Sequence, residues 1–338
     1  MSQLIPRTRT DREAAEAHLS PAATRAVGGG DRQSAEPADE YRTCFERDRD
    51  RIIHSKAFRR LKHKTQVFID PDGDHTVTRL THTLQVAQVA RSIAGALSLN
   101  EPLAEAIALG HDVGHTPFGH IGEDALASFF PDGWVHSVQS VRIFDVLEPL
   151  NLCEQTRDGI LAHPWKVSPG PATPEGACVR FADRIAYLTH DVLDALRAGM
   201  VDTTDLPATV TQRLGEPGSV WIGVMIKGVV EHSVQVGTVE MDPSLLPVMH
   251  ELRDYMFTRV YLGPEQQGQT RAARRVVTEL VAYLLDHPDQ IADSYTDPQA
   301  DHLTRVADFV SGMTDRYALA LHDRWFRPFS SGAAPSTP

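Results

Sequence analysis

Apolar residues along most of the chain recur every three or four positions, the spacing that gathers them on one face of an α-helix. The clearest stretch runs from Val77 to Leu97 through Leu80, Leu84 and Ala87. A second stretch begins at Pro102, a typical helix start, and continues until glycine and proline end it. With three similar stretches, the pattern predicts helices over residues 77–97, 102–113, 175–197, 271–285 and 302–325.

Strand patterns are weak by comparison, and residues 234–241 form the best short candidate. The sequence therefore predicts a mainly α fold with little or no β structure, in which the helices form a single domain over residues 41–330. Residues 1–40 are predicted to form a weakly ordered segment, because glycine and proline interrupt any apolar repeat there. Residues 331–338 predict a flexible tail.

Charge and composition exclude several classes of protein. The 338 residues include 33 Lys and Arg against 45 Asp and Glu, a formal net charge of −12, which is unusual for a binder of nucleic acid or polyphosphate. No apolar run reaches the ~18 residues of a membrane helix, and three cysteines cannot build a disulfide framework. The polar N-terminus lacks a secretory signal, so we expect a cytoplasmic protein without a membrane partner.

The distribution of histidine and aspartate points to a metal site. Three predicted helices can each offer ligands to one ion: His82 from the middle of the first, His111 and Asp112 from the end of the second, and Asp183 from a later one. Imidazole and carboxylate together suit divalent transition metals. A lone histidine or aspartate is usually a satisfied polar residue. The adjacent His-Asp pair and the three histidines within residues 111–120 favour the metal reading over that alternative.

Seven blocks of sequence resemble the deoxyguanosine-triphosphate triphosphohydrolase-like proteins among the HD-domain phosphohydrolases. The resemblance covers about residues 41–329, and its blocks follow the family's order. They are DRDRIIH (48–54), AFRRL (57–61), KTQVF (64–68), RLTHT (79–83), HDVGHTPFGHIGE (111–123), FADRIAY (181–187) and GMTDR (312–316). It implies an HD-type helical fold with a metal core over about residues 50–200 and additional C-terminal helices over about residues 200–330.

The resemblance implies the same four ligands that the pattern suggests, His82, His111, Asp112 and Asp183, around one divalent ion. Mn²⁺ or Mg²⁺ is expected first, with Fe, Co or Ni as alternatives. It also implies a catalytic pair, His120 and Glu123, whose spacing places both side chains on one face of a helix. His115, one turn from His111, is a further catalytic candidate for a phosphate contact or an outer metal contact. A hydrogen bond to a backbone carbonyl is its structural alternative.

Five positions are implied to bind substrate. Arg79 and Arg184 would contact phosphate, for which the planar guanidinium is well suited, although either could instead cap a helix or pair with a surface acid. Tyr187 and Asp191 share a helical stripe with Asp183 and would contact the sugar, as would Gln66. Tyr187 could equally be a core aromatic residue. Base-reading residues are not identifiable from the sequence.

The segment from Arg42 to Lys64 is basic, in contrast to the negative net charge of the whole chain. It contains nine Lys or Arg residues and three acids, a local excess of six positive charges. For about half of these charges we favour a solvated helix with alternating ion pairs. The others could line the phosphate site, a regulatory nucleotide site or a groove for single-stranded DNA.

The leading hypothesis is an enzyme that hydrolyses deoxynucleoside triphosphates, dGTP or dNTPs more broadly, to deoxynucleoside and inorganic triphosphate. One alternative is an HD-type phosphatase or phosphodiesterase acting on nucleoside monophosphates, cyclic nucleotides or nucleic-acid ends. A second is a sensor of dNTP or single-stranded DNA in which catalysis is secondary. The resemblance also predicts a homo-oligomer. Residues 200–247 have the least distinctive pattern, so base preference and nucleotide activation stay open.

Overall fold

The structure, a computed structural model, describes residues 4–67, 77–261, 263, 267–292 and 297–326. Within these ranges the regular secondary structure is helical, with two isolated β-bridges and no strand. This confirms the predicted mainly α class. The α-helices are α1 (Arg9–Ala15), α2 (Cys44–His54), α3 (Lys56–Arg60), α4 (Arg79–Ala96), α5 (Glu101–Gly110), α6 (His120–Ala127), α7 (His136–Arg142), α8 (Glu154–Ala162), α9 (Pro174–Arg197), α10 (Ala208–Leu214), α11 (Ser219–Val236), α12 (Leu246–Met256), α13 (Gln267–Asp286), α14 (His302–Ser311) and α15 (Asp315–Phe326). Short 3₁₀ or π segments cover Glu16–His18, Leu61–His63, Ile143–Leu147, Thr203–Asp205, Phe257–Tyr261 and Pro288–Gln290.

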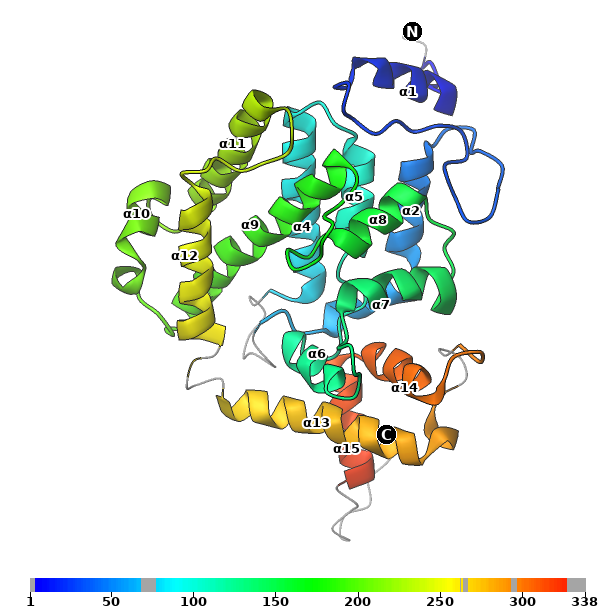
Figure 1. Ribbon diagram of the computed structural model, residues 1–338, viewed down its shortest axis with the longest axis vertical. Helices are drawn as coiled ribbons and strands as arrows, with labels where there is room; N and C mark the ends of the chain where they lie inside the picture. The colour runs from blue at the N-terminus through cyan, green and yellow to red at the C-terminus, as the bar shows by residue number, and fades with distance from the viewer. Residues whose placement is uncertain (1–3, 68–76, 262, 264–266, 293–296, 327–338) are drawn as a thin grey trace.

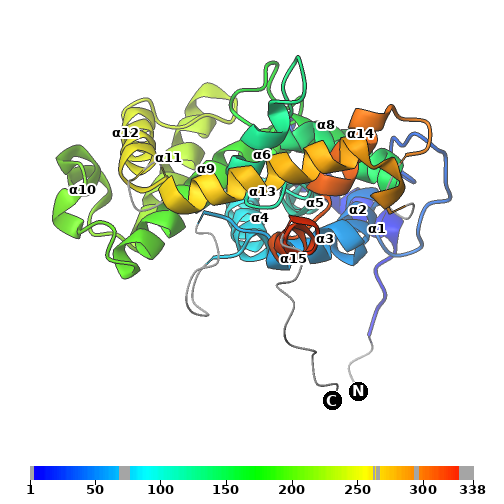
Figure 2. The same ribbon diagram turned by 90° about the horizontal axis from the view of Figure 1, so that it is seen from below.

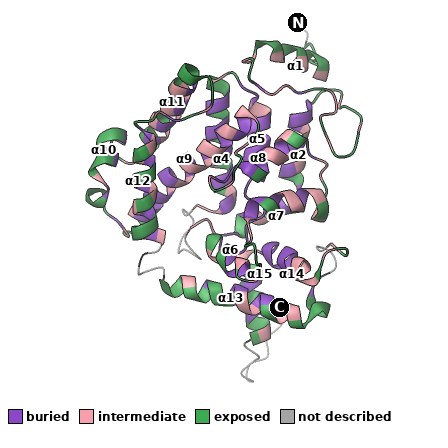
Figure 3. Ribbon diagram, in the orientation of Figure 1, coloured by how far each residue is buried: buried purple, intermediate pink, exposed green. Residues whose placement is uncertain are grey.

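The centre of the molecule is built from α4, α5 and α9 (Figure 1). In that view α2 and α8 flank them on one side, and α10, α11 and α12 lie on the other. Buried residues concentrate on the central helices, whereas α1, α10 and α13 present many exposed positions (Figure 3). Burial of this apolar surface, at ~25 cal/mol per Å², is the main force that holds the central helices together.

Local sequence signals set the ends of the central helices. Thr78 caps α4 by accepting a hydrogen bond from the Thr81 amide, and Asn100 caps α5 by accepting one from Leu103. Thr173 caps α9, which starts at Pro174. These side chains satisfy amides that a helix N-terminus leaves without intrahelical partners. The caps therefore fix where the ligand-bearing stretches begin.

The C-terminal helices α13, α14 and α15 form a second hydrophobic core of their own. Figure 2 shows α13 running across this end of the molecule with α6 and α14 beside it, and Figure 1 shows α15 crossing it. The second core contains Val277, Leu280 and Val310 from the C-terminal helices, and Leu126 from α6. Helix α6 therefore packs with residues distant in the sequence, although it lies between α5 and α7 along the chain.

Three sequence predictions need correction. The predicted helix over residues 302–325 is two helices, because the chain leaves the helical path between Ser311 and Asp315. Residues 234–241 form no strand: α11 runs to Val236 and ends at Gly237, whose left-handed φ of 80° closes the helix. Leu84 was expected to face inward but is 51% exposed, because α4 lies between α5 and α9 and buries a face centred elsewhere.

The weakly ordered segment expected over residues 1–40 stays a prediction, but residues 4–40 make buried contacts with the body of the molecule. The Arg32 guanidinium forms a fully buried ion pair with Asp48, with 2.6 Å between Nη1 and Oδ1, and Thr24 donates to the buried Glu175 at 2.7 Å. Breaking either contact would leave a buried charge without its partner, so the segment is held against the body. The tail over residues 331–338 lies outside the described residues, and the domain boundaries stay predictions. No helix in the described ranges is long and apolar enough to cross a membrane.

Candidate active site

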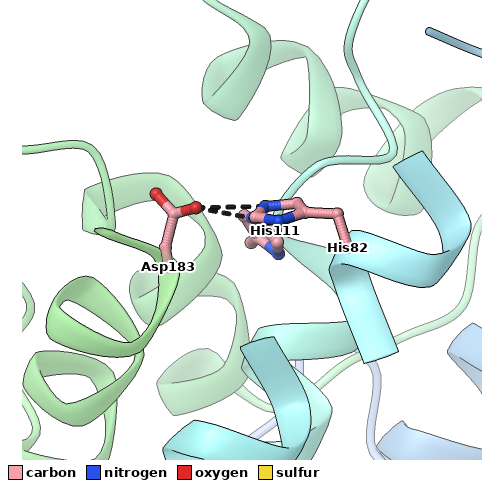
Figure 4. Close-up of side chains that lie close together, drawn as sticks. All are labelled: His82, His111 and Asp183. Atoms are coloured by element: carbon pink, nitrogen blue, oxygen red, sulfur yellow. Dashed lines mark hydrogen bonds and ion pairs between the residues drawn. The ribbon is translucent and has the colours of Figure 1, made fainter. Parts of the chain in front are cut away.

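Three of the predicted metal ligands meet where α4, the end of α5 and α9 come together (Figure 4). His82 lies in the first turn of α4, rather than mid-helix as expected, and its Nε2 is 3.2 Å from Asp183 Oδ1. His111 follows the last residue of α5, and its Nε2 is 3.8 Å from the same oxygen. Ligand bonds of about 2.1 Å place neighbouring donor atoms roughly 3 Å apart. The three atoms therefore have the spacing that a single divalent ion requires.

The fourth predicted ligand, Asp112, lies beside them. Its Oδ1 is 3.2 Å from His111 Nε2, and its Oδ2 is 3.9 Å from His82 Nε2. Burial raises the pKa of Asp112, but His111, His115 and Arg79 outweigh this effect and hold the pKa well below its usual range. Asp183 behaves similarly: burial raises its pKa, yet the hydrogen bond with His82 contributes to a net lowering to about 2. Both carboxyl groups are thus ionised at neutral pH, the form that binds metal.

The environment of His111 gives an independent test of the metal assignment. Its Nδ1 lies 2.6 Å from the Ala108 carbonyl oxygen, an arrangement in which Nδ1 carries the proton. Its Nε2 is buried and has no hydrogen-bond partner among the described residues. A buried nitrogen of this kind is costly unless something binds its lone pair. The donor set therefore fits a divalent metal.

His120 and Glu123 form the pair that their spacing suggests. His120 begins α6, and its Nδ1 is 3.1 Å from Glu123 Oε2. The imidazole is 72% exposed, whereas the carboxylate is buried. Burial raises the pKa of Glu123, but His136, His120 and His115 together lower it far below its usual value. The side chain of His120 can therefore face a ligand while a buried negative charge supports it from behind.

Two histidines that were not singled out from the sequence, His136 and His163, belong to the same cluster. His136 Nδ1 is 3.2 Å from Glu123, and its ring stacks on His115 with 3.8 Å between centroids. His163 Nε2 is 3.3 Å from His136 Nε2. His163 ends α8 much as His111 ends α5, with Nδ1 2.8 Å from a backbone carbonyl oxygen three residues earlier. The one local signal in the sequence that could have identified His163 is its position at a helix end, directly before a proline.

His115 connects the two halves of the cluster. Its Nε2 is 3.3 Å from Asp112 Oδ1, and its Nδ1 is 3.8 Å from Glu123 Oε2. Burial, with the nearby positive charge of Arg79, lowers the pKa of His115 well below that of a free histidine. Its ring is therefore neutral at physiological pH. The structural alternative, a side-chain bond to a backbone carbonyl, is not observed, since Nδ1 has no hydrogen-bond partner among the described residues.

The two predicted phosphate-binding arginines differ in their surroundings. Arg79 is buried, pairs with Asp112 and donates to the Thr65 carbonyl at 3.1 Å. The Arg184 guanidinium stacks on the Trp165 ring at 3.8 Å from the centroid. The next residue of that loop, Lys166, was not predicted from the sequence. Its Nζ is 3.9 Å from Glu123 Oε1 and its side chain is 63% exposed.

The polar stripe on α9 continues from Asp183 to Tyr187 and Asp191. Asp191 is buried and accepts a hydrogen bond from the Tyr261 hydroxyl at 2.6 Å. Burial raises the pKa of Asp191 to about 8 and that of Tyr187 to about 12. Gln66 lies near Gly119, and its side-chain oxygen is buried without a hydrogen-bond partner in the described part of the chain.

Most arginines of the basic segment pair with acids. Arg42 pairs with Asp39 at 2.8 Å, and Arg47 and Arg51 both pair with Glu36, at 3.0 and 2.8 Å. Arg49 pairs with the adjacent Asp50. This matches the ion-paired interpretation for these four charges. Binding of DNA or a regulatory nucleotide by the rest of the segment stays a prediction, as does oligomerisation.

Comparison with known proteins matches this architecture. Residues 79–188 match the HD domain, and residues 239–324 match the phosphohydrolase-associated domain. A deoxyguanosinetriphosphate triphosphohydrolase-like protein from Caldanaerobacter subterraneus subsp. tengcongensis is 45% identical over 321 residues, 92% of this chain and 93% of that protein. One of the same name from Clostridium perfringens (strain 13) is 45% identical over 310 residues, 88% and 91% of the two chains.

A crystal structure of a hypothetical protein from Aquifex aeolicus shares the fold, with a TM-score of 0.50 and 20% sequence identity over 83% of this chain and 71% of that one. The relatives at 45% identity extend over nearly the whole chain, and the HD match spans all four predicted ligands. The protein is therefore an HD-domain phosphohydrolase that belongs to the deoxyguanosinetriphosphate triphosphohydrolase-like family.

Proposed function

We propose that this enzyme hydrolyses deoxynucleoside triphosphates to the deoxynucleoside and inorganic triphosphate. The observation that carries the proposal is that the candidate metal ligands and the candidate acid belong to one connected cluster of histidines and carboxylates. A metal-competent set of His82, His111, Asp112 and Asp183 stands next to an exposed histidine, His120, backed by a buried carboxylate. The names of the relatives support a nucleoside triphosphate as substrate.

A divalent ion held by these four ligands, Mn²⁺ or Mg²⁺ in the first instance, would supply Lewis-acid activation of the α-phosphate and of a nucleophilic water. The chain prepares its ligands for this role. The His111–Ala108 contact leaves Nε2 free for metal, and both carboxyl groups stay ionised. Asp112 is further held by Arg79, so its orientation does not depend on the ion.

His120 is proposed as the general acid for the departing 5′ oxygen. Its Nδ1 faces Glu123, so Nε2 is the atom available to donate a proton. The buried, ionised Glu123 lies behind the ring and orients the imidazole through this contact. His136 donates its backbone N–H to the same carboxylate at 3.1 Å, which helps to fix the position of the carboxylate.

Cationic side chains around this pair can neutralise the triphosphate, and neutralisation with positioning accounts for most catalysis in phosphoryl transfer. Arg184 stacks on the ring of Trp165, and Lys166 follows Trp165 in the chain. The sugar would lie along the α9 stripe, where Tyr187 and Asp191 face the cluster. An Asp191 that keeps its proton can donate to, as well as accept from, a sugar hydroxyl.

Product identity tests the proposal directly. The purified protein with Mn²⁺ is incubated with each of the four dNTPs, with and without a second nucleotide, and the products are separated by anion-exchange chromatography. We expect deoxynucleoside and intact triphosphate in equal amounts. Nucleoside monophosphate with pyrophosphate would refute the proposal. Orthophosphate released from a nucleoside monophosphate, with dNTPs untouched, would establish the phosphatase alternative instead.

A further inference from the structure

The two halves of the candidate active site stand on different hydrophobic cores. The metal ligands belong to α4, to the end of α5 and to α9, which surround the larger core. His120 and Glu123 belong to α6, whose apolar residues Ala125 and Leu126 pack into the second core with α13, α14 and α15. Something must therefore hold the second core in register with the first if acid and metal are to act on one substrate.

Asp315, the first residue of α15, makes the bonds that do this. Its Oδ1 accepts a hydrogen bond from the Phe118 amide at 2.9 Å. Its Oδ2 accepts from the Thr65 amide at 2.9 Å and also from the Thr65 hydroxyl. One carboxylate on a C-terminal helix thus binds two separate segments of the active site, the turn before α6 and the segment before α4.

The Phe118 bond matters because the turn before His120 is conformationally demanding. Phe118 has a φ of +62° and Gly119 a φ of +58°. Both lie in the left-handed region, which residues other than glycine rarely adopt. Gly119 is the N-cap of α6 and has no side chain to cap it. The hydrogen bond that the Phe118 amide donates to Asp315 therefore helps to hold the entry to α6, and with it the direction in which His120 points.

The Thr65 bonds lead to the metal side. The Thr65 carbonyl oxygen accepts from Arg79 Nε and Nη2 at 3.3 and 3.1 Å, and the same guanidinium pairs with Asp112. The neighbouring Lys64 makes a parallel link: its buried ammonium donates to the His115 carbonyl oxygen and, at 2.8 Å, to the Ser311 carbonyl oxygen of α14. Both links run from the C-terminal helices to the catalytic residues.

We propose that Asp315 is a positioning residue of this enzyme, which sets His120 relative to the metal ligands through the Phe118–Gly119 turn and through Thr65. The inference rests on the proposed function for its kinetic consequence only. Asp315 touches neither the predicted ligands nor the acid. It acts by fixing two backbone segments whose separation determines the geometry of proton transfer.

The variant Asp315→Asn tests it, because it keeps the side chain's size but replaces one acceptor oxygen with an N–H donor. In the full-length, Mn²⁺-loaded enzyme we expect kcat for a dNTP to fall by about tenfold or more, with KM changed by less than about threefold. A substrate with sulfur in place of the bridging 5′ oxygen provides the critical comparison, since a thiolate leaves without protonation. Its kcat should fall by less than about threefold. Equal losses with both substrates would overturn the proposal.

A second measurement does not depend on the reaction. Hydrogen exchange followed by mass spectrometry should show faster exchange across residues 115–123 in Asp315→Asn than in the wild type, because the asparagine has a single acceptor oxygen for the amides of Phe118 and Thr65. Unchanged exchange there would overturn the proposal even if the protein had another substrate. If the wild type releases no triphosphate but this exchange difference is present, the proposed function fails and the positioning role stands.

Asp301→Asn is the matched control. Asp301 caps α14 by accepting from the Thr304 amide at 3.0 Å, and within the described residues its side chain hydrogen-bonds to Thr304 at that helix start. Asp301→Asn should leave kcat for the dNTP, kcat for the sulfur-containing substrate and the hydrogen exchange of residues 115–123 unchanged. The milder variant Thr65→Val removes only the hydroxyl bond to Asp315. It should also lower kcat for the dNTP more than kcat for the sulfur-containing substrate, but by a smaller factor than Asp315→Asn does. It serves as the test if Asp315→Asn does not fold.

Discussion

Asp191 provides a test of the electrostatics on α9 that needs no substrate. The carboxyl group is buried, and its pKa is about 8 despite the hydrogen bond from Tyr261, which acts in the lowering direction. An aspartate in the unfolded chain titrates near pKa 3.9. Between these two values the native protein holds a proton that the unfolded chain has lost. Stability from this group is therefore greatest at low pH and declines as the pH rises towards 8.

The expected magnitude follows from the separation of the two pKa values. From about pH 5 to about pH 7.5, this linkage removes roughly 3 kcal/mol of wild-type stability, at about 1.4 kcal/mol per pKa unit. The variant Asp191→Asn has no titrating group at this position and keeps an oxygen for the Tyr261 hydroxyl. Its free energy of unfolding, relative to the wild type, should therefore rise by roughly 3 kcal/mol over the same interval.

Urea unfolding of both proteins at the two pH values measures this difference directly, with chelator present throughout so that metal binding does not contribute. Asp202→Asn is the control: Asp202 is a surface residue whose pKa is lowered by hydrogen bonds from Thr204, so it gives no such gain as the pH rises. A relative stability that stays constant between the two pH values, or falls as the pH rises, would show that Asp191 is ionised in the native protein and would refute the reasoning.

Three further variants test other parts of the structure. Asp112→Ala should abolish turnover and lower the bound Mn²⁺ measured by mass spectrometry, because it removes a ligand and leaves the buried Arg79 without its carboxylate; full activity would show that the metal has been misplaced. Gly114→Ala should lower the melting temperature by several degrees, since its Cβ would lie 2.3 Å from the His136 carbonyl oxygen and 2.4 Å from the Ser140 amide nitrogen, whereas Gly268→Ala, with open space around it, should not; equal melting temperatures would contradict the clash. Lys166→Met should raise KM for a dNTP several-fold with little change in kcat, and Lys166→Arg should restore it, if the ammonium near Glu123 binds phosphate; an unchanged KM would exclude that contact.

Much of the site follows from short-range sequence patterns. His111 and Asp112 lie at the end of a helix that Pro102 and the glycines delimit, and His120 and Glu123 are three residues apart on the next helix. The structure brings His111 to Asp183 and pairs His120 with Glu123, although their roles stay predictions. His136 was missed because no local pattern sets it apart, and the only local signal for His163 is the proline that follows it at the end of α8. They reach the cluster through the packing of α7 and α8, which a single sequence does not encode at short range.

The errors in the fold have a common physical origin. Helical periodicity identifies a face only when one side of a helix is buried, and α4 is packed between two helices, so Val86, Val89 and Ile93 are buried while Leu84 is half exposed. Likewise, the helix predicted over residues 302–325 passes through residues 312–314, but the chain leaves the helical path there, and Asp315 at the start of α15 bonds to Thr65 and Phe118. Tertiary contacts decide both cases.

The division of the site between two hydrophobic cores has a consequence for how the enzyme fails. Heat, denaturant or a protease that opens the smaller core first would displace α6 while leaving α4, α5 and α9 in place. Such a molecule would retain its full metal content and most of its helical signal, yet lack the proton donor. Metal stoichiometry and circular dichroism would then report an intact preparation in which few molecules turn over, and only an active-site titration would count the competent fraction.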